Sequence, residues 1–385
     1  MIYLDYAATT PMSSTALQAY LQAAEQFYAN SSSLHDAGTE ARRALEGSRK
    51  AIATLLEVPF RGLHFTGSGS EANFLALVSL ARSRNSSLNH IISTDVEHSS
   101  VRNSLSWMEK MGFDITRLPV EPDGRVSPEK VANSLRDQTA LVSIQHVNSE
   151  IGSVQPLQKI GNLLKGHPAF FHSDLIQSFG KLDLNPLQCR LDSFSISAHK
   201  VHGPKGLGAA WTDPSISWKP FIPETVHEHG FRPGTVDVPA TVAFAVAAKE
   251  AVRHRDENLK KVTRLKTLLI DVLREQLPEH LFIEGDPALC SPYILGLRIH
   301  GMEGQYAMLE CSQQNVGFST GSACQVNEQK PSATLLSMGR SEEEAKSFIR
   351  LSLSSQTTEE EIQSAGRVLR DVVKRYLERS GLSTL

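Results

Sequence analysis

Between about residues 60 and 212, short apolar segments alternate with segments of helical spacing, and this alternation constrains the fold more than any other feature. HIIST (90–94) and TALVSIQHV (139–147) are typical of strands, whereas PLQKIGNLLKGH (156–167) places its apolar residues on one face of a helix. Strands that alternate with helices predict a mostly parallel sheet with helices packed on its faces. The expected fold class is therefore α/β.

The last third of the chain has a different texture, which indicates a second, smaller α+β domain. A charged helical segment (255–277) precedes the strand-like YILGLRI (293–299). A chain of 385 residues is also longer than one hydrophobic core usually supports. We expect a large domain over residues 14–257 and a small domain built from residues 1–13 and 258–385.

The charged residues are balanced, because 39 Lys and Arg stand against 42 Asp and Glu and give a formal net charge of −3. Proteins that bind nucleic acid or an anionic membrane usually carry a basic surface, so we expect neither partner. No apolar run approaches the roughly 20 residues that a membrane-spanning helix needs. The N-terminal MIYLDYAATTP lacks the pattern of a signal peptide, and we expect a cytoplasmic protein.

The cysteines and histidines give little support for a metal centre. His227 and His229 are two residues apart in VHEHGFR, which is weak support beside the spacing of a helical metal site. The four cysteines are widely spaced and form no CxxC pair: Cys189, Cys290, Cys311 and Cys324. We therefore expect neither a metal site nor a disulfide framework.

Functional side chains gather just after the predicted strands. In α/β sheets, ligands bind beyond the carboxyl ends of the strands. FTGSGSEAN (65–73) is a Gly/Ser loop that opens a helix and could bind a phosphate with its backbone amides. Each polar residue, taken singly, is explained equally well as a helix cap or a satisfied core group. The residues that follow the other strands are His98, Asp174, Ser197, His199 and Lys200.

Together these residues supply what pyridoxal phosphate needs. The aldehyde of this cofactor requires a lysine, which Lys200 provides, and its pyridine nitrogen requires a carboxylate, which Asp174 provides. His98 could lie flat on the ring. The candidate phosphate ligands carry hydroxyl or imidazole groups: Ser70, Ser197 and His199.

A second lysine competes for the cofactor aldehyde. Lys205 lies five residues after Lys200, inside the Gly/Pro turn of GPKG. Lys200 follows its strand directly, so the strand-end rule favours Lys200.

The order and approximate spacing of many motifs resemble those of the cysteine desulfurases, which are pyridoxal phosphate enzymes of the class V aminotransferase-like group with fold type I. The resemblance extends from Tyr3 to the final helix. It implies that Gln177 faces the ring hydroxyl and that Gly69 joins the phosphate ligands. Thr235 would reach the phosphate of a neighbouring subunit, which implies a homodimer. The motifs are YLDYAATTP, FTGSGSEAN, VEHSSV, HVNSEIG, HSDLIQSFGK, SAHKVHGPKG, FRPGT, STGSAC and IRLSLSSQTTEEE.

The resemblance also changes the interpretation of Cys324. This residue lies in TGSACQVNEQKPS, a polar segment that we expect to form a mobile, exposed loop. A loop cysteine without a role is the alternative. The resemblance implies that L-cysteine is the substrate, with its carboxylate held by Arg350 and, with less support, by Asn30. Lys200 would remove the Cα proton, the Cys324 thiolate would take the sulfur as a persulfide, and His98 is a candidate for proton transfers near the substrate thiol.

Some positions depart from the family pattern. Ser149 replaces a second asparagine that lies near the cofactor hydroxyl, Ser355 replaces a second arginine, and 224–226 replaces a glycine triplet. We expect cofactor binding to survive these changes. Two alternatives stay open: an aminotransferase or lyase that does not use Cys324, and a weakly active paralogue that acts as a partner in sulfur delivery. The sequence also leaves open activity on selenocysteine and the sulfur acceptor, whether an iron–sulfur scaffold or a thiolation enzyme.

Overall fold

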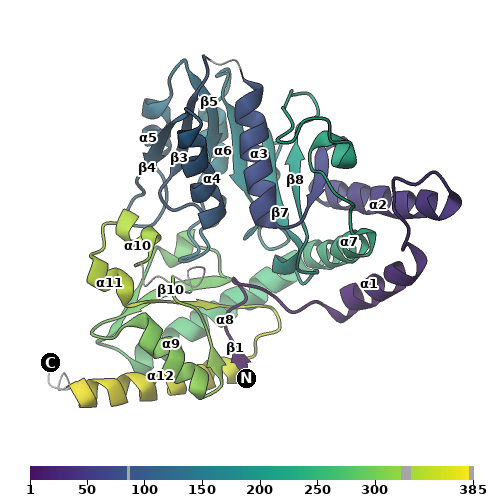
Figure 1. Ribbon diagram of the computed structural model, residues 1–385. Coiled ribbons are helices and arrows are strands. Elements are labelled where there is room, and N and C mark those ends of the chain that lie inside the picture. The colour runs from purple at the N-terminus through teal and green to yellow at the C-terminus, as the bar shows by residue number, and fades with distance from the viewer. Residues whose placement is uncertain (85–86, 322–330, 381–385) are drawn as a thin grey trace.

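The structure, a computed structural model, describes residues 1–84, 87–321 and 331–380. A seven-stranded sheet forms the centre of the larger lobe (Figure 1). Only one of its strands, β8, runs antiparallel to its neighbours; the remaining pairs are parallel. From edge to edge the strands are β2 (Leu63–Thr66), β8 (Gly208–Thr212), β7 (Ser193–Ser197), β6 (Phe170–Asp174), β5 (Thr139–Ser143), β3 (His90–Thr94) and β4 (Asp114–Leu118). The predicted α/β class with a mostly parallel sheet is confirmed.

Helices cover this sheet, and the strands between β2 and β3 are consequently buried along their whole length. That burial explains why apolar residues stand next to one another in strands such as TALVS and GAAWT, as is typical of strands covered on both faces. Two further helices, α1 (Ser14–Gln26) and α2 (Asp36–Leu55), pack against α7 and project sideways as an arm (Figure 1). The other helices of this lobe are α3 (Gly69–Ser83), α4 (Ser99–Lys110), α5 (Pro128–Ser134), α6 (Leu157–Leu163) and α7 (Val238–Arg253).

The smaller lobe has its own sheet and its own apolar core. In it, β10 (Ile294–Ile299) pairs antiparallel with β12 (Phe348–Ser352) on one side and with β9 (Leu281–Ile283) on the other. The N-terminal residues belong to this core, since Leu4 packs with side chains of the C-terminal third. Its helices are α8 (Arg255–Gln276), α9 (Gly304–Gln313), α10 (Ala333–Ser337), α11 (Glu342–Lys346) and α12 (Glu359–Ser380).

The N-terminal strand brings the start of the chain to the junction of the two lobes. β1 (Ile2–Tyr3) pairs in parallel with β11 (Val316–Gly317), and Asp5 forms an isolated bridge with Ser352 at the end of β12. The chain then turns sharply, because the carbonyl of Asp5 accepts hydrogen bonds from the amides of Ala8 and Thr9. We call residues 5–10 the N-terminal turn.

No helix in residues 1–84, 87–321 and 331–380 is long and apolar enough to cross a membrane. The same residues contain no group of three or more His, Cys, Asp or Glu side chains placed to hold a metal ion.

Candidate active site

The N-terminus of α3 and the end of β7 meet closely. A Cβ atom added to Gly69, the first residue of α3, would lie 3.1 Å from the Cβ of Ser197 and 2.4 Å from Ile176. A larger residue here would therefore require the Ile176 side chain to move and would crowd Ser197. The hydroxyl of Ser197 is buried and has no hydrogen-bond partner. Ser70, which follows Gly69 in the sequence, is exposed. An unpartnered hydroxyl next to a helix N-terminus, where backbone amides point out of the helix, suits a phosphate group.

Asp174 ends β6 with its carboxylate buried and held by two N–H donors. Asn73 of α3 donates to Oδ2 at 2.8 Å, and the amide of Ile176 donates to Oδ1 at 2.9 Å. These two donors fix the orientation of the carboxylate, and a carboxylate is the group that the pyridine nitrogen of the cofactor requires. Asn73 was not predicted as a site residue, although it stands in the FTGSGSEAN motif four residues after Gly69, one helical turn further along α3.

His98 is the N-cap of α4, and its ring is fixed by Ser100. Nδ1 lies 2.8 Å from the Ser100 hydroxyl and 3.2 Å from the Ser100 amide, which donates to it. Burial lowers the pKa of His98; Asp174 opposes that shift and Lys200 adds to it. These influences link three predicted site residues, and the neutral imidazole suits both stacking and proton transfer.

Lys200 ends the short 3-10 helix η2 (Ala198–Lys200), directly after β7. Its Nζ donates to the carbonyl oxygens of Ala7 at 2.5 Å and Ala8 at 2.6 Å. Gln177 also reaches this turn, because its Nε2 donates to the Ala7 carbonyl at 2.9 Å, while its Oε1 is buried without a partner. The rival lysine, Lys205, is exposed.

The same turn fixes His199. The Thr9 hydroxyl lies 3.0 Å from Nδ1 of His199, and the Thr10 amide and hydroxyl donate to the His199 carbonyl. Burial lowers the pKa of His199 to about 4, and the positive charge of Lys200 contributes. His199 is therefore neutral at neutral pH, and it is available as a hydrogen-bonding group.

Arg350 lies on β12, facing the N-terminal turn from the smaller lobe. Its Nη2 pairs with Oδ1 of Asp5 at 2.7 Å, and its Nη1 donates to the carbonyl oxygen of Ser149 at 2.8 Å. Its Nε is buried and has no partner. Asp5 was not predicted as a site residue, and Ser149 takes part through its backbone.

Two predicted residues, Asn30 and Thr235, are not joined to this cluster within the described residues of one chain. Asn30 is exposed in the connection between α1 and α2, where its side chain accepts from the Ser32 amide. That arm projects away from the smaller lobe (Figure 1). Thr235 is also exposed. Cys324 lies outside the described residues.

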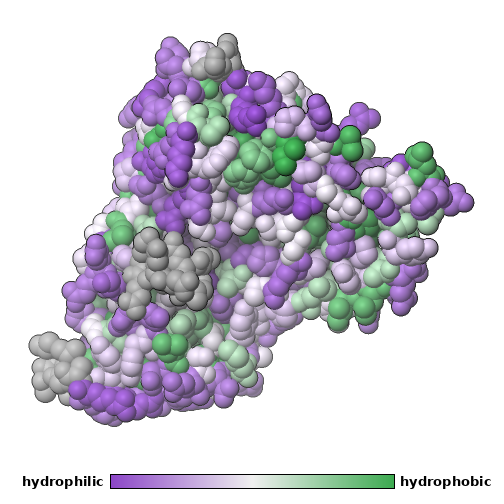
Figure 2. All heavy atoms as spheres, viewed as in Figure 1, coloured by the Kyte–Doolittle hydropathy of each residue, from purple (hydrophilic) through white to green (hydrophobic). Residues whose placement is uncertain are grey.

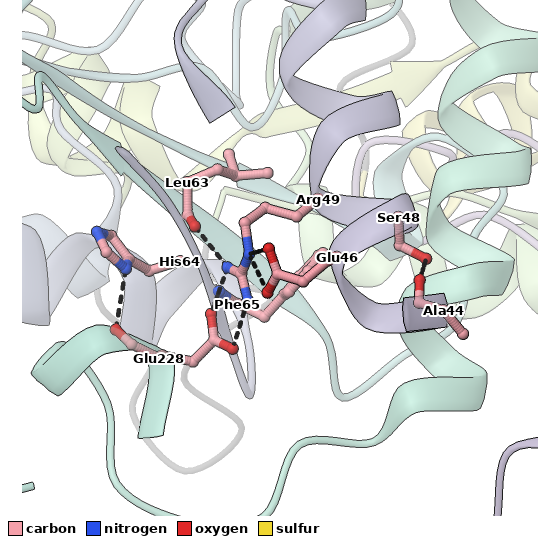
Figure 3. A network of polar contacts seen from close by, with 8 residues as sticks. All are labelled: Ala44, Glu46, Ser48, Arg49, Leu63, His64, Phe65 and Glu228. Atoms are coloured by element: carbon pink, nitrogen blue, oxygen red, sulfur yellow. Dashed lines mark hydrogen bonds and ion pairs between the residues drawn. The ribbon is translucent and has the colours of Figure 1, made fainter. Parts of the chain in front are cut away.

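A buried ion pair fixes the turn that precedes Thr235 (Figure 3). Arg49 of α2 donates to both carboxylate oxygens of Glu228 at 2.8 and 2.9 Å, and Glu228 also accepts from the Phe65 amide. Burial alone would raise the pKa of Glu228, but the contacts with Arg49 lower it. Glu228 has a left-handed backbone (φ 47°), which this anchoring supports.

Sequence comparisons identify the family of this chain. The aminotransferase class-V family matches residues 2–364. A Bacillus subtilis (strain 168) protein, whose name assigns it to the NifS cysteine desulfurases, is 41% identical over 364 residues, which are 94% of this chain and 92% of that protein. The chain belongs to the cysteine desulfurases. The resemblance that its motifs predicted is thereby confirmed, and so is the cofactor, since this is a pyridoxal phosphate-dependent family.

Solved structures of similar proteins agree with this assignment. A structure described as a NifS-like protein is 27% identical to this desulfurase and superposes with a TM-score of 0.90, covering 97% of this chain and 99% of that one. A structure described as SspA in complex with cysteine is 31% identical, with a TM-score of 0.80 over 92% of this chain and 99% of that one. Fold type I, as predicted, is confirmed.

The site residues fit pyridoxal phosphate on observations of this structure. Two buried polar atoms at the site lack partners, the Ser197 hydroxyl and Gln177 Oε1, and both are hydrogen-bonding groups that a polar ligand could satisfy. Gly69 lets the N-terminus of α3 approach the Ser197 side chain closely, and the Asp174 carboxylate is held by Asn73. In this desulfurase, Lys200, Asp174 and the N-terminus of α3 are therefore the groups that could hold the cofactor.

Proposed function

We propose that this protein removes the sulfur of free L-cysteine, giving L-alanine and a persulfide on Cys324. One observation carries the proposal: Lys200 and Arg350 are both bonded to the N-terminal turn. The cofactor that Lys200 would bind and the guanidinium of Arg350 would thus face the amino and carboxyl groups of an α-amino acid. The cysteine bound to the 31% identical SspA supports the choice of substrate.

When bound, pyridoxal phosphate supplies an electron sink for charge that develops at the substrate Cα. Arg350 holds the substrate carboxylate, for which a planar guanidinium is suited. Lys200 removes the Cα proton as a general base. His98, neutral because burial lowers its pKa, accepts or returns the proton of the substrate thiol.

Sulfur transfer itself requires a second thiol. The Cys324 thiolate attacks the substrate sulfur, an S–S bond forms, and the Cβ–S bond breaks. The electron pair of the broken bond stays with the carbon skeleton, which takes up protons and leaves as L-alanine. The persulfide then goes to an acceptor protein, either a scaffold for iron–sulfur clusters or a thiolation enzyme.

We further propose that two copies assemble. The arm formed by α1 and α2 carries large hydrophobic side chains that one chain leaves open: Leu17 is 47% exposed, Leu21 55% and Leu34 90%. Figure 2 shows hydrophobic side chains on this projecting arm. If a second copy buried this patch, the exposed Thr235 and Asn30 would contact the active site of that copy, as a shared active site requires.

L-Alanine formation tests the proposed function. The protein is loaded with pyridoxal phosphate and given L-cysteine and a reducing thiol, and a Cys324→Ala variant is assayed beside it. We expect alanine from the wild type and a loss of at least about a hundredfold in the variant, because the nucleophile is gone. The control is Cys290→Ala, since burial raises the pKa of Cys290 to about 11 and keeps that thiol protonated. Equal turnover by the Cys324→Ala variant would refute the role of Cys324.

A further inference from the structure

We infer that Asp5 is a positioning residue that makes the site selective for α-amino acids. Together with the rest of the N-terminal turn, it fixes the guanidinium of Arg350 relative to the amine of Lys200. The inference rests on the proposed role of Arg350 as the carboxylate-binding group. It assigns to Asp5 a function that no strand-end or motif argument predicted.

The Asp5–Arg350 contact leaves one edge of the guanidinium for a ligand. Asp5 occupies Nη2 and the Ser149 carbonyl occupies Nη1, so the group is held on two sides. Nε, the remaining donor nitrogen, is buried without a partner. The ion pair is shielded from water, with 8% of the Arg350 side chain and 19% of the Asp5 side chain exposed. Orientation of a planar donor group decides whether it can bind a carboxylate through two hydrogen bonds.

The backbone around Asp5 is firmly bonded. The Tyr3 hydroxyl donates to the carbonyls of both Asp5 and Thr9, at 3.1 and 3.0 Å. The amide of Ala7 donates to the hydroxyl of Ser352, two residues after Arg350 on β12. The turn is therefore hydrogen-bonded to β12, the strand that carries Arg350. Side-chain and backbone contacts together fix the position of Arg350 relative to the turn.

Lys200 is bonded two and three residues further along this turn. Because Ala7 and Ala8 accept from Nζ while Asp5 holds Nη2, a single short segment sets the separation between amine and guanidinium. In an α-amino acid the amino and carboxyl groups share one carbon, so their separation is fixed and short. A turn that fixes Arg350 relative to the lysine that binds the cofactor would therefore select for that spacing.

The alternative role for Asp5 is to compete with the substrate carboxylate for Arg350. A carboxylate that merely occupies Arg350 would hinder a substrate carboxylate, and its removal would tighten binding. Positioning predicts weaker binding after removal, because a displaced guanidinium loses bidentate geometry and small displacements in a site are costly. The two roles thus differ in the sign of one measurable change.

The experiment compares two ligands that differ only in the carboxylate, L-alanine and ethylamine. Their half-saturation concentrations are read from the visible absorbance of the loaded cofactor in wild type, Asp5→Ala, Asp5→Asn and Arg350→Ala proteins. The control is Asp183→Ala, which removes an aspartate that pairs with Arg255 at 2.7 Å but is 83% exposed. The KM for L-cysteine is measured in parallel.

We expect Asp5→Ala to raise the half-saturation concentration for L-alanine, and the KM for L-cysteine, at least about tenfold. Binding of ethylamine should change less than about twofold, which also shows that the variant site has folded. Asp5→Asn, whose amide oxygen can still accept from Arg350, should fall between wild type and Asp5→Ala. Asp183→Ala should match wild type.

Three results would overturn the inference: unchanged or tighter binding of L-alanine by Asp5→Ala, equal weakening of both ligands, or a loss in Asp183→Ala as large as that in Asp5→Ala. If Arg350→Ala loses L-alanine selectively while Asp5→Ala does not, Asp5 has no positioning role and the proposed function stands. If Arg350→Ala itself leaves L-alanine binding unchanged, the proposed carboxylate site is wrong.

Discussion

The active site has two walls of different origin. One wall consists of strand ends in the larger lobe, where Asp174, Ser197 and Lys200 follow β6 and β7. The other is the N-terminal turn, which lies near the start of the chain and contacts Lys200, His199 and Arg350. The first wall supplies reactive side chains, whereas the second supplies mainly backbone carbonyls and one carboxylate. Chemistry and positioning are therefore encoded in distant parts of the sequence.

The largest expected effect lies where the two walls meet. Lys200→Ala should reduce alanine formation from L-cysteine by at least about 10³-fold, because the group that binds the cofactor and the general base are lost together. Lys205→Ala is the matched control, since Lys205 is exposed and should retain turnover within about twofold. A larger loss in Lys205→Ala than in Lys200→Ala would reverse the assignment.

The strand-end wall and its sheet should also determine the acid sensitivity of the protein. Burial lowers the pKa of His64 and His146 to about 4, below the ordinary value of 6.5. Each is neutral when folded and takes up a proton when unfolded, so its contribution to stability is present above pH 6.5 and is lost as pH falls toward 4. At pH 5 the loss is on the order of 2 kcal/mol for each histidine.

Urea unfolding at pH 7.5 and pH 5 measures this dependence. His146→Gln should show a smaller drop in unfolding free energy between the two pH values than wild type does. The exposed His300 provides the control, and His300→Gln should keep the full drop. An unchanged pH dependence in His146→Gln would contradict burial of a neutral imidazole at that position.

The smallest expected effect comes from a change at the N-terminal turn, and it tests whether the two walls act separately. Tyr3→Phe removes the hydroxyl that donates to Asp5 and Thr9 in the turn, and it should raise the KM for L-cysteine about threefold with cofactor affinity unchanged. Asn73→Ala, which removes the donor to Asp174, should instead weaken pyridoxal phosphate binding about tenfold or more. Loss of cofactor affinity in Tyr3→Phe would mean that the turn does not act separately from the strand-end wall.

The sequence predicted the first wall because its rule is local. A polar residue directly after an apolar strand must lie at the carboxyl edge of a parallel sheet, so Asp174 and Lys200 could be placed together without coordinates. Asn73 was missed because it lies inside the first two turns of α3, where an asparagine resembles any helix residue. Only the approach of α3 to β6 reveals its contact.

The second wall could not be predicted from residue types. Ala7 and Ala8 act through carbonyl oxygens, which every residue possesses, and their partner Lys200 is more than 190 positions away in the sequence. From the sequence alone, Asp5 could equally have served only to form the turn. Its partner Arg350 is separated from it by 345 positions, and their proximity follows from the pairing of the N-terminal segment with β12.

A crystal structure of the pyridoxal phosphate-loaded protein with L-alanine would test the two-wall account most directly. The account predicts that the alanine carboxylate lies within hydrogen-bonding distance of the Arg350 guanidinium, that Asp5 still pairs with Nη2, and that the cofactor phosphate contacts the Ser197 hydroxyl at the α3 N-terminus. A carboxylate bound away from Arg350, or an Asp5 displaced from it by the ligand, would contradict the account.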